Sequence, residues 1–138
     1  MTEVKPPEQI GFTIPIAPIT KKNSQRILIN RSTGRPFVAP SQQYKNYEQA
    51  AGWFMPKVKA PIAKPVNVAA RFYLPTRRRT DLVNLEEALL DVMVRYAVLA
   101  DDNSNIVVSM DGSKVLYDKE NPRTEVTINF ISDGAVVE

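Results

Sequence analysis

An amphipathic segment that ends at Tyr96 constrains the fold of this chain more than any other feature. The spacing predicts a helix that begins near Thr80 or Asp81, either of which can cap it. A helix with one apolar side must bury that side, so the rest of the chain has to supply an apolar surface. Its apolar residues recur at helical spacing and form one stripe, which consists of Leu82, Leu85, Leu89, Val92, Met93 and Tyr96.

Runs rich in β-branched and aromatic residues supply that surface. Pro15 and Pro18 lack amide donors, so the first run suits the edge of a sheet. A second helix is predicted from its N-cap Ser41 to Met55, because Pro56 stops it. The strand-like runs are residues 11–19, 26–30, 36–40, 66–74, 106–110, 113–117 and 124–131.

The order of these elements mixes hairpins with crossovers, which favours the α+β class. We predict a single domain in which about two main helices pack on one face of a mixed β-sheet. Asp111 and Gly112 lie between two strand-like runs and predict a hairpin turn. The predicted domain covers residues 11–131, between a loose leader at 1–10 and a frayed C-terminus at 132–138.

The composition narrows the chemistry that is open to the chain. It contains no cysteine and no histidine, which excludes thiol catalysis, Ser-His triads and zinc sites built from these residues. Any reaction must therefore use carboxylates, lysine, tyrosine or a bound ion, and we expect no organic cofactor. No apolar run approaches the roughly 20 residues of a membrane span, and the N-terminus lacks a signal-peptide core. We expect a cytoplasmic protein without membrane contact.

The net charge of +3 conceals a strong asymmetry. Residues 1–79 carry 14 Lys and Arg against 3 Asp and Glu, whereas residues 80–138 carry 4 against 12. One interpretation is that the two halves neutralise each other within one fold. The other is that a basic surface binds a polyanion beside an acidic metal site.

Carboxylates at the two ends of the long helix are candidate metal ligands. Asp81 alone is an ordinary N-cap residue, and Asp101 and Asp102 alone are ordinary turn residues. Because the helix spans roughly 22 Å, its ends can share a site only if the chain returns along another element or if a second subunit supplies a carboxylate. Converging carboxylates require a cation, and ligands that are all oxygen favour Mg²⁺. Metal-assisted hydrolysis of a phosphodiester needs neither histidine nor cysteine.

Two basic segments are candidate phosphate contacts. Arg77, Arg78 and Arg79 directly precede the long helix, so their guanidinium groups and the positive end of the helix could address one phosphate. The second segment contains Lys21, Lys22 and Asn23. Each segment could also be an ordinary solvated loop.

The motifs RRRTDLVNL at 77–85 and ADDNSN at 100–105 resemble the RusA-type Holliday junction resolvases of bacteria and their phages, and IPIAPITKKN at 14–23 extends the resemblance. The resemblance implies a RusA-like α+β fold, a homodimer, four-way DNA junctions as substrate, and Mg²⁺ as cofactor with Mn²⁺ as the alternative. It implies that Asp81 and Asp102 bind metal and are catalytic, with a contribution from Asp101. The DNA contacts that it implies are Thr20, Lys21, Lys22, Asn23, Arg77, Arg78, Arg79 and Asn84.

The chain departs from the family pattern at two positions. Val83 replaces the middle aspartate of better-studied members, and Glu87 replaces a lysine on the same helix. Both Glu87 and Asp91 share a helical face with Asn84, so we hypothesise that one of them replaces the missing carboxylate as a catalytic metal ligand. This pattern resembles a phage or prophage subgroup, active in the bacterial host cell. The alternatives are a catalytically lapsed DNA-binding protein and a domain without nuclease activity.

Overall fold

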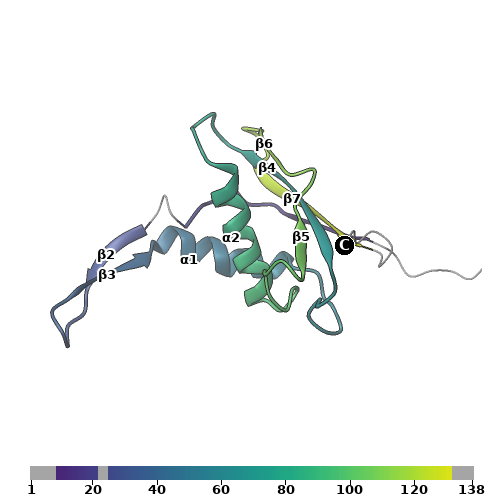
Figure 1. The fold of residues 1–138 in the computed structure, drawn as a ribbon. Coiled ribbons are helices and arrows are strands. Elements are labelled where there is room, and N and C mark those ends of the chain that lie inside the picture. The colour runs from purple at the N-terminus through teal and green to yellow at the C-terminus, as the bar shows by residue number, and fades with distance from the viewer. Residues whose placement is uncertain (1–8, 22–24, 132–138) are drawn as a thin grey trace, which may run out of the picture.

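A mixed five-stranded sheet forms the centre of the molecule in the computed structural model, which describes residues 9–21 and 25–131 (Figure 1). Its strand order is β1-β7-β4-β5, and β6 also pairs with β4. The pairs β1–β7 and β4–β7 are antiparallel, whereas β5 and β6 run parallel to β4. The strands are β1 (Gln9–Ile14), β4 (Val66–Leu74), β5 (Val107–Ser109), β6 (Lys114–Tyr117) and β7 (Arg123–Phe130).

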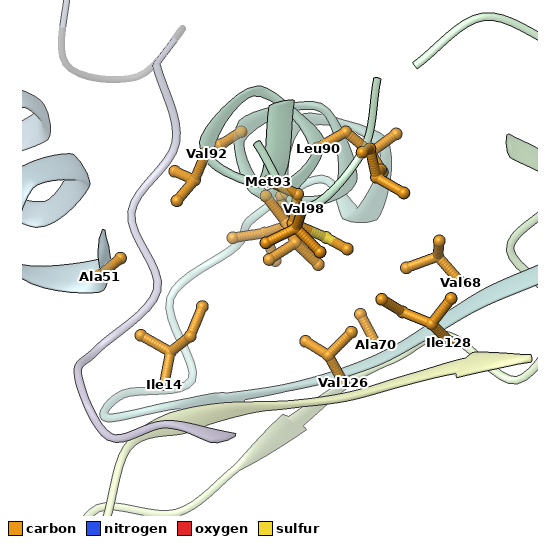
Figure 2. Packing of buried hydrophobic residues seen from close by; sticks show 14 of the residues in the cluster. Ile14, Ala51, Val68, Ala70, Leu90, Val92, Met93, Val98, Val126 and Ile128 are labelled. Atoms are coloured by element: carbon orange, nitrogen blue, oxygen red, sulfur yellow. The ribbon is translucent and has the colours of Figure 1, made fainter. Parts of the chain in front are cut away.

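Two helices lie on one face of this sheet, as the sequence predicts. They are α1 (Gln42–Ala51), which continues into the short 3-10 helix η2 (Gly52–Phe54), and α2 (Leu82–Arg95). Figure 2 shows Met93 of α2 on the side of the helix that faces the sheet with Val126 and Ile128 of β7, and Val92 on the side toward Ala51 of α1. Since inward and outward side chains alternate along β4 and β7, one face of the sheet supplies the buried surface that the stripe on α2 requires.

Local chemistry explains where β1 ends and where α1 begins. β1 lies at the sheet edge as predicted and ends at Ile14, one residue before Pro15. It begins at Gln9, two residues before the domain start that we predict. Ser41 caps α1 as predicted, because its hydroxyl accepts a hydrogen bond from the Tyr44 amide at 3.0 Å. The predictions for residues 1–8 and 132–138 lie outside the described part of the chain.

The predicted hairpin at Asp111 and Gly112 is wrong. β5 and β6 do not pair with each other but follow one another along β4, both parallel to it. The Asn67 side chain in β4 explains this course, because it accepts the Asp111 amide and donates to the Asp111 carbonyl oxygen. The Ser113 hydroxyl accepts the Ala70 amide at 3.0 Å. Side chains thus hold the Asp-Gly segment against β4 instead of letting it reverse.

A separate two-stranded antiparallel ribbon, β2 (Gln25–Ile29) and β3 (Pro36–Pro40), precedes α1. Figure 1 shows it extending away from the sheet beyond α1. It occupies the two short strands predicted around the turn at 32–35. We call β2, β3 and their turn the β2–β3 arm.

Candidate metal and DNA site

Asp81 occupies the N-cap position of α2, but its carboxylate does not cap the helix. The Asp81 backbone carbonyl accepts the Asn84 and Leu85 amides, whereas no side-chain cap hydrogen bond forms. Instead, the Asn84 side-chain amide lies 3.5 Å from a carboxylate oxygen of Asp81. Asp81 is exposed. Its carboxylate therefore lies at the positive end of the helix dipole without accepting a hydrogen bond from the helix backbone.

One face of α2 carries a line of acidic and amide side chains. Asn84, Glu87 and Asp91 recur at intervals of three and four residues, which places them on one face along successive turns. Glu87 is exposed, and Asp91 is half-buried and pairs with the Lys21 ammonium at 3.1 Å. This acidic face runs from Asp81 toward the C-terminal end of α2. Val83 is not part of it but is 67% exposed beside Asp81.

The end of α2 directs the chain back toward this acidic face. Ala97 has a positive φ of 61°, and the Val98 amide donates to the Met93 carbonyl at 2.9 Å. This left-handed residue with its long backward hydrogen bond is a common way to end a helix. Leu99 then forms a parallel bridge with Ile62. The next residues, including Asp102, therefore lie beside the last turns of α2.

Asp91 and Asp102 line the same shallow hollow. Both belong to the ring of side chains around it, although Asp102 is 11 residues further along the chain. Burial raises the pKa of Asp102, and the neighbouring carboxylates of Asp101 and Asp91 raise it further. Carboxylates that line one hollow repel each other, and this repulsion favours the binding of a cation or a proton. The complete lining is Lys21, Glu48, Asp91, Val94, Arg95 and Asp102.

Asp101 differs from Asp102 in how its carboxylate is used. One oxygen of Asp101 accepts the Asp102 amide at 2.7 Å, and the other accepts the Asn103 side-chain amide at 3.2 Å. The hydrogen bond from the Asp102 backbone lowers the pKa of Asp101. Asp101 therefore shapes the turn, while the carboxylate of Asp102 borders the hollow.

The three arginines lie beside the N-terminal end of α2, whereas Lys21 lies further along the helix, at Asp91. Arg77, Arg78 and Arg79 are all exposed, and the guanidinium of Arg77 lies 4.5 Å from the ring centroid of Tyr117. Arg78 and Thr20 line one further hollow, so the two predicted DNA-contacting segments are neighbours. Thr20 itself is buried, at 4% exposure. Its side chain is therefore placed to support the loop, while Lys22 and Asn23 lie outside the described residues.

The structure brings some predicted metal ligands together and separates others. Asp91 and Asp102 share a hollow, but Asp91 lies ten residues, about 15 Å of helix, beyond Asp81. Among residues 9–21 and 25–131, no three acidic side chains are grouped closely enough to hold a metal ion. Within those residues, Asp102 lies with Asp91 and not in a group of three acidic side chains that includes Asp81.

Two charged residues of the hollow were not candidates from the sequence. Glu48 on α1 pairs with Arg95 on α2, with 2.6 Å between the carboxylate oxygen and the guanidinium nitrogen. The position of Arg95 on the acidic face is visible in the sequence, but Glu48 enters the site only through the packing of α1 on α2. No local motif marks it.

Residues 15–129 match the sequence model of a family described as endodeoxyribonuclease RusA, which covers most of the chain. No curated protein matches the chain. Within the described residues, no helix is both long and apolar enough to cross a membrane.

Proposed function

This chain belongs to the endodeoxyribonuclease RusA family, whose members are metal-dependent Holliday junction resolvases, and we propose that it makes paired cuts in four-way DNA junctions as a Mg²⁺-dependent homodimer. In this proposal the protein is encoded by a phage or prophage. It acts in the recombination and repair of DNA in the cytoplasm of the bacterial host. The observation that carries the proposal is the acidic face of α2, with Asp81 at one end and the Asp91–Asp102 hollow at the other.

The donor chemistry of this face fits a hard divalent cation. Every candidate ligand is a carboxylate or an amide, and oxygen ligands are those that Mg²⁺ prefers. The hollow is lined by three carboxylates, Glu48, Asp91 and Asp102, against the two cationic side chains of Lys21 and Arg95, and Lys21 already neutralises part of this negative charge through Asp91. When bound, such a cation would offset the charge that develops on the phosphate during hydrolysis.

A second copy of the chain could complete the site. If two α2 helices pack antiparallel about a two-fold axis, Asp81 of one copy approaches the Asp91–Asp102 hollow of the other. Such an interface is isologous, so it creates two equivalent sites at once. Two symmetric sites are what paired cuts in opposite strands of a junction require. The separation of Asp81 from Asp102 within one chain supports this arrangement.

The remaining polar residues have distinct roles in this proposal. Arg77, Arg78 and Arg79 bind and orient the DNA backbone next to the N-terminus of α2. Lys21 holds Asp91 in position, and Asp101 fixes the turn that carries Asp102. Glu87 lies between the two ends of the acidic face and is the candidate to replace the carboxylate absent at Val83.

Replacing Asp102 tests the metal site. We expect Asp102→Asn to lower cleavage of a synthetic four-way junction in Mg²⁺ by at least about a hundredfold, because it removes a charged metal ligand. Junction binding in EDTA should change by less than about threefold, since the phosphate contacts remain. Glu120→Gln, which neutralises an exposed carboxylate elsewhere, is the control. Undiminished cleavage by Asp102→Asn would contradict the assignment.

Two observations support a second candidate function, which the same assay tests. Val83 stands where the resolvase motif carries a carboxylate, and no three acidic side chains converge within the described residues. These features suit a protein that binds branched DNA without cutting it. A wild-type protein that binds the junction but leaves it intact in Mg²⁺ and in Mn²⁺ would favour this second function.

A further inference from the structure

The β2–β3 arm carries an apolar face that no part of the described chain covers. Its register pairs Ile27 with Val38 and Ile29 with Pro36, which places these four side chains on the same face. Ile27 is 73% exposed, Ile29 is 68% exposed and Val38 is 63% exposed. Branched aliphatic side chains so fully exposed on one short ribbon indicate a surface that becomes covered in use.

The opposite face of the β2–β3 arm shows that the ribbon has a defined orientation. Ala39 lies on that face and is only 9% exposed, Leu28 is half-buried there, and Phe37 is 45% exposed, less than Ile27, Ile29 or Val38. The apolar face of Ile27, Ile29, Pro36 and Val38 is therefore the outward one. Figure 1 shows the ribbon extending past α1, away from the sheet.

The tip of the β2–β3 arm is ordered by its own hydrogen bonds and is cationic. The Asn30 side chain accepts the Ser32 and Thr33 amides, and the Gly34 amide donates to the Asn30 carbonyl. Arg31 and Arg35 are exposed on this turn. A closed turn of this kind presents the two guanidinium groups from a fixed support.

The charge around the β2–β3 arm favours a polyanion as the partner. Residues 9–47 contain no Asp or Glu but contain Lys21, Lys22, Arg26, Arg31, Arg35 and Lys45. A second copy of the same arm would bring like charges together, which is unfavourable. DNA instead offers phosphates for the arginines.

A DNA branch point adds the apolar surface that an intact duplex hides. Where stacking is interrupted, base faces are exposed next to phosphates, and isoleucine and proline are among the side chains that proteins insert at such steps. Each arm strand has five residues, so the ribbon is roughly 16 Å long, longer than either groove of the duplex is deep. The arm is thus long enough to reach the base stack from the backbone.

We propose that the β2–β3 arm recognises branched DNA by placing its apolar face against the unstacked bases at the branch point, while Arg31 and Arg35 bind the flanking phosphates. The arm is then the element by which the protein distinguishes a four-way junction from a linear duplex. This inference rests on the proposed function, because it names the feature of the DNA junction that the proposed nuclease would recognise.

The double variant Ile27→Thr/Val38→Thr tests the apolar face. Threonine keeps the β-branched shape, so the ribbon should persist. Binding is measured in EDTA to a four-way junction with 2-aminopurine at the branch point and to a linear duplex of the same sequence. We expect the preference for the junction to fall about tenfold, because apolar contacts of two aliphatic side chains with the bases are lost, with duplex affinity unchanged within about twofold. The rise in 2-aminopurine fluorescence on binding should also disappear.

Controls separate the arm from the fold, the assembly and the proposed function. Val108→Thr removes an equally branched, 53% exposed side chain from β5 and should retain the preference. Unchanged preference and fluorescence in the double variant would overturn the arm's role. A double variant with half the sedimenting mass of the wild type would also overturn it, because the apolar face would then join two copies. A wild-type protein that binds both DNAs equally would instead contradict the proposed function.

Discussion

At the scale of single residues, neighbouring carboxylates have different roles because their hydrogen bonds differ. Asp101 accepts two hydrogen bonds within its own turn, whereas Asp102 borders the hollow that contains Asp91. Their pKa values shift in opposite directions for this reason. Adjacent aspartates in a sequence are therefore not interchangeable as metal ligands.

The arginine at the start of β7 permits a test of electrostatics away from the site. Arg123 donates to Asp118 and to Glu125 at 2.9 Å each, and its hydrogen bonds hold the pKa values of both carboxyl groups below their usual range. Carboxyl groups with lowered pKa values stabilise the folded state above their unfolded pKa of about 4 and lose this contribution as pH falls. The pairs should thus stabilise the protein at pH 7 but not in acid.

We expect Arg123→Gln to lower the melting temperature at pH 7 by more than it does at pH 3. The difference that remains in acid should reflect the packing of Arg123 on the Tyr73 ring, whose centroid is 3.8 Å from the guanidinium carbon. Thermal melts followed by circular dichroism from pH 3 to pH 7 measure the gap. A gap that stays constant with pH would mean that the ion pairs contribute nothing.

At the scale of elements, α2 is the part of the site most fully predictable from sequence. Its stripe and its polar face are both periodic, so the burial of Leu85 and Leu89 and the position of Asp91 follow from spacing alone. The Asp-Gly segment at 111–112 misled because a turn signal is local, whereas the partner that holds it, Asn67, lies in β4. Glu48 was missed for the same reason, since only the contact between α1 and α2 brings it to the hollow.

The end of α2 predicts a stabilising substitution. Ala97 adopts a positive φ of 61°, which costs an L residue with a side chain about 1–2 kcal/mol relative to glycine. We expect Ala97→Gly to raise the free energy of unfolding by about 0.5–1 kcal/mol, because the loss of strain exceeds the added chain entropy. Urea denaturation measures it, and Ala100→Gly in the following loop is the control. Equal or lower stability of Ala97→Gly would contradict the helix-end geometry.

At the scale of the whole molecule, the structure shows where the basic and the acidic residues of the two halves of the chain lie. Arg77–Arg79 lie at the N-terminal end of α2 with Thr20 beside Arg78. The acidic face extends from there to the hollow of Asp91 and Asp102, where Lys21 pairs with Asp91. Sequence alone could not place the two ends of that face, because separation along a helix does not reveal how two copies assemble. The proposed homodimer explains why a complete set of ligands is not found in one described chain.

The most direct test of this account mixes two inactive subunits. Asp81→Asn and Asp102→Asn chains with different affinity tags are co-expressed, and the mixed dimer is isolated by tandem purification. If Asp81 and Asp102 of different copies share a site, one site of the mixed dimer retains both carboxylates and the other has neither. We expect each homodimer to be inactive and the mixed dimer to nick one strand of a four-way junction in Mg²⁺. A mixed dimer that binds the junction but remains as inactive as its parents, while a wild-type dimer cuts, would contradict the two-subunit site.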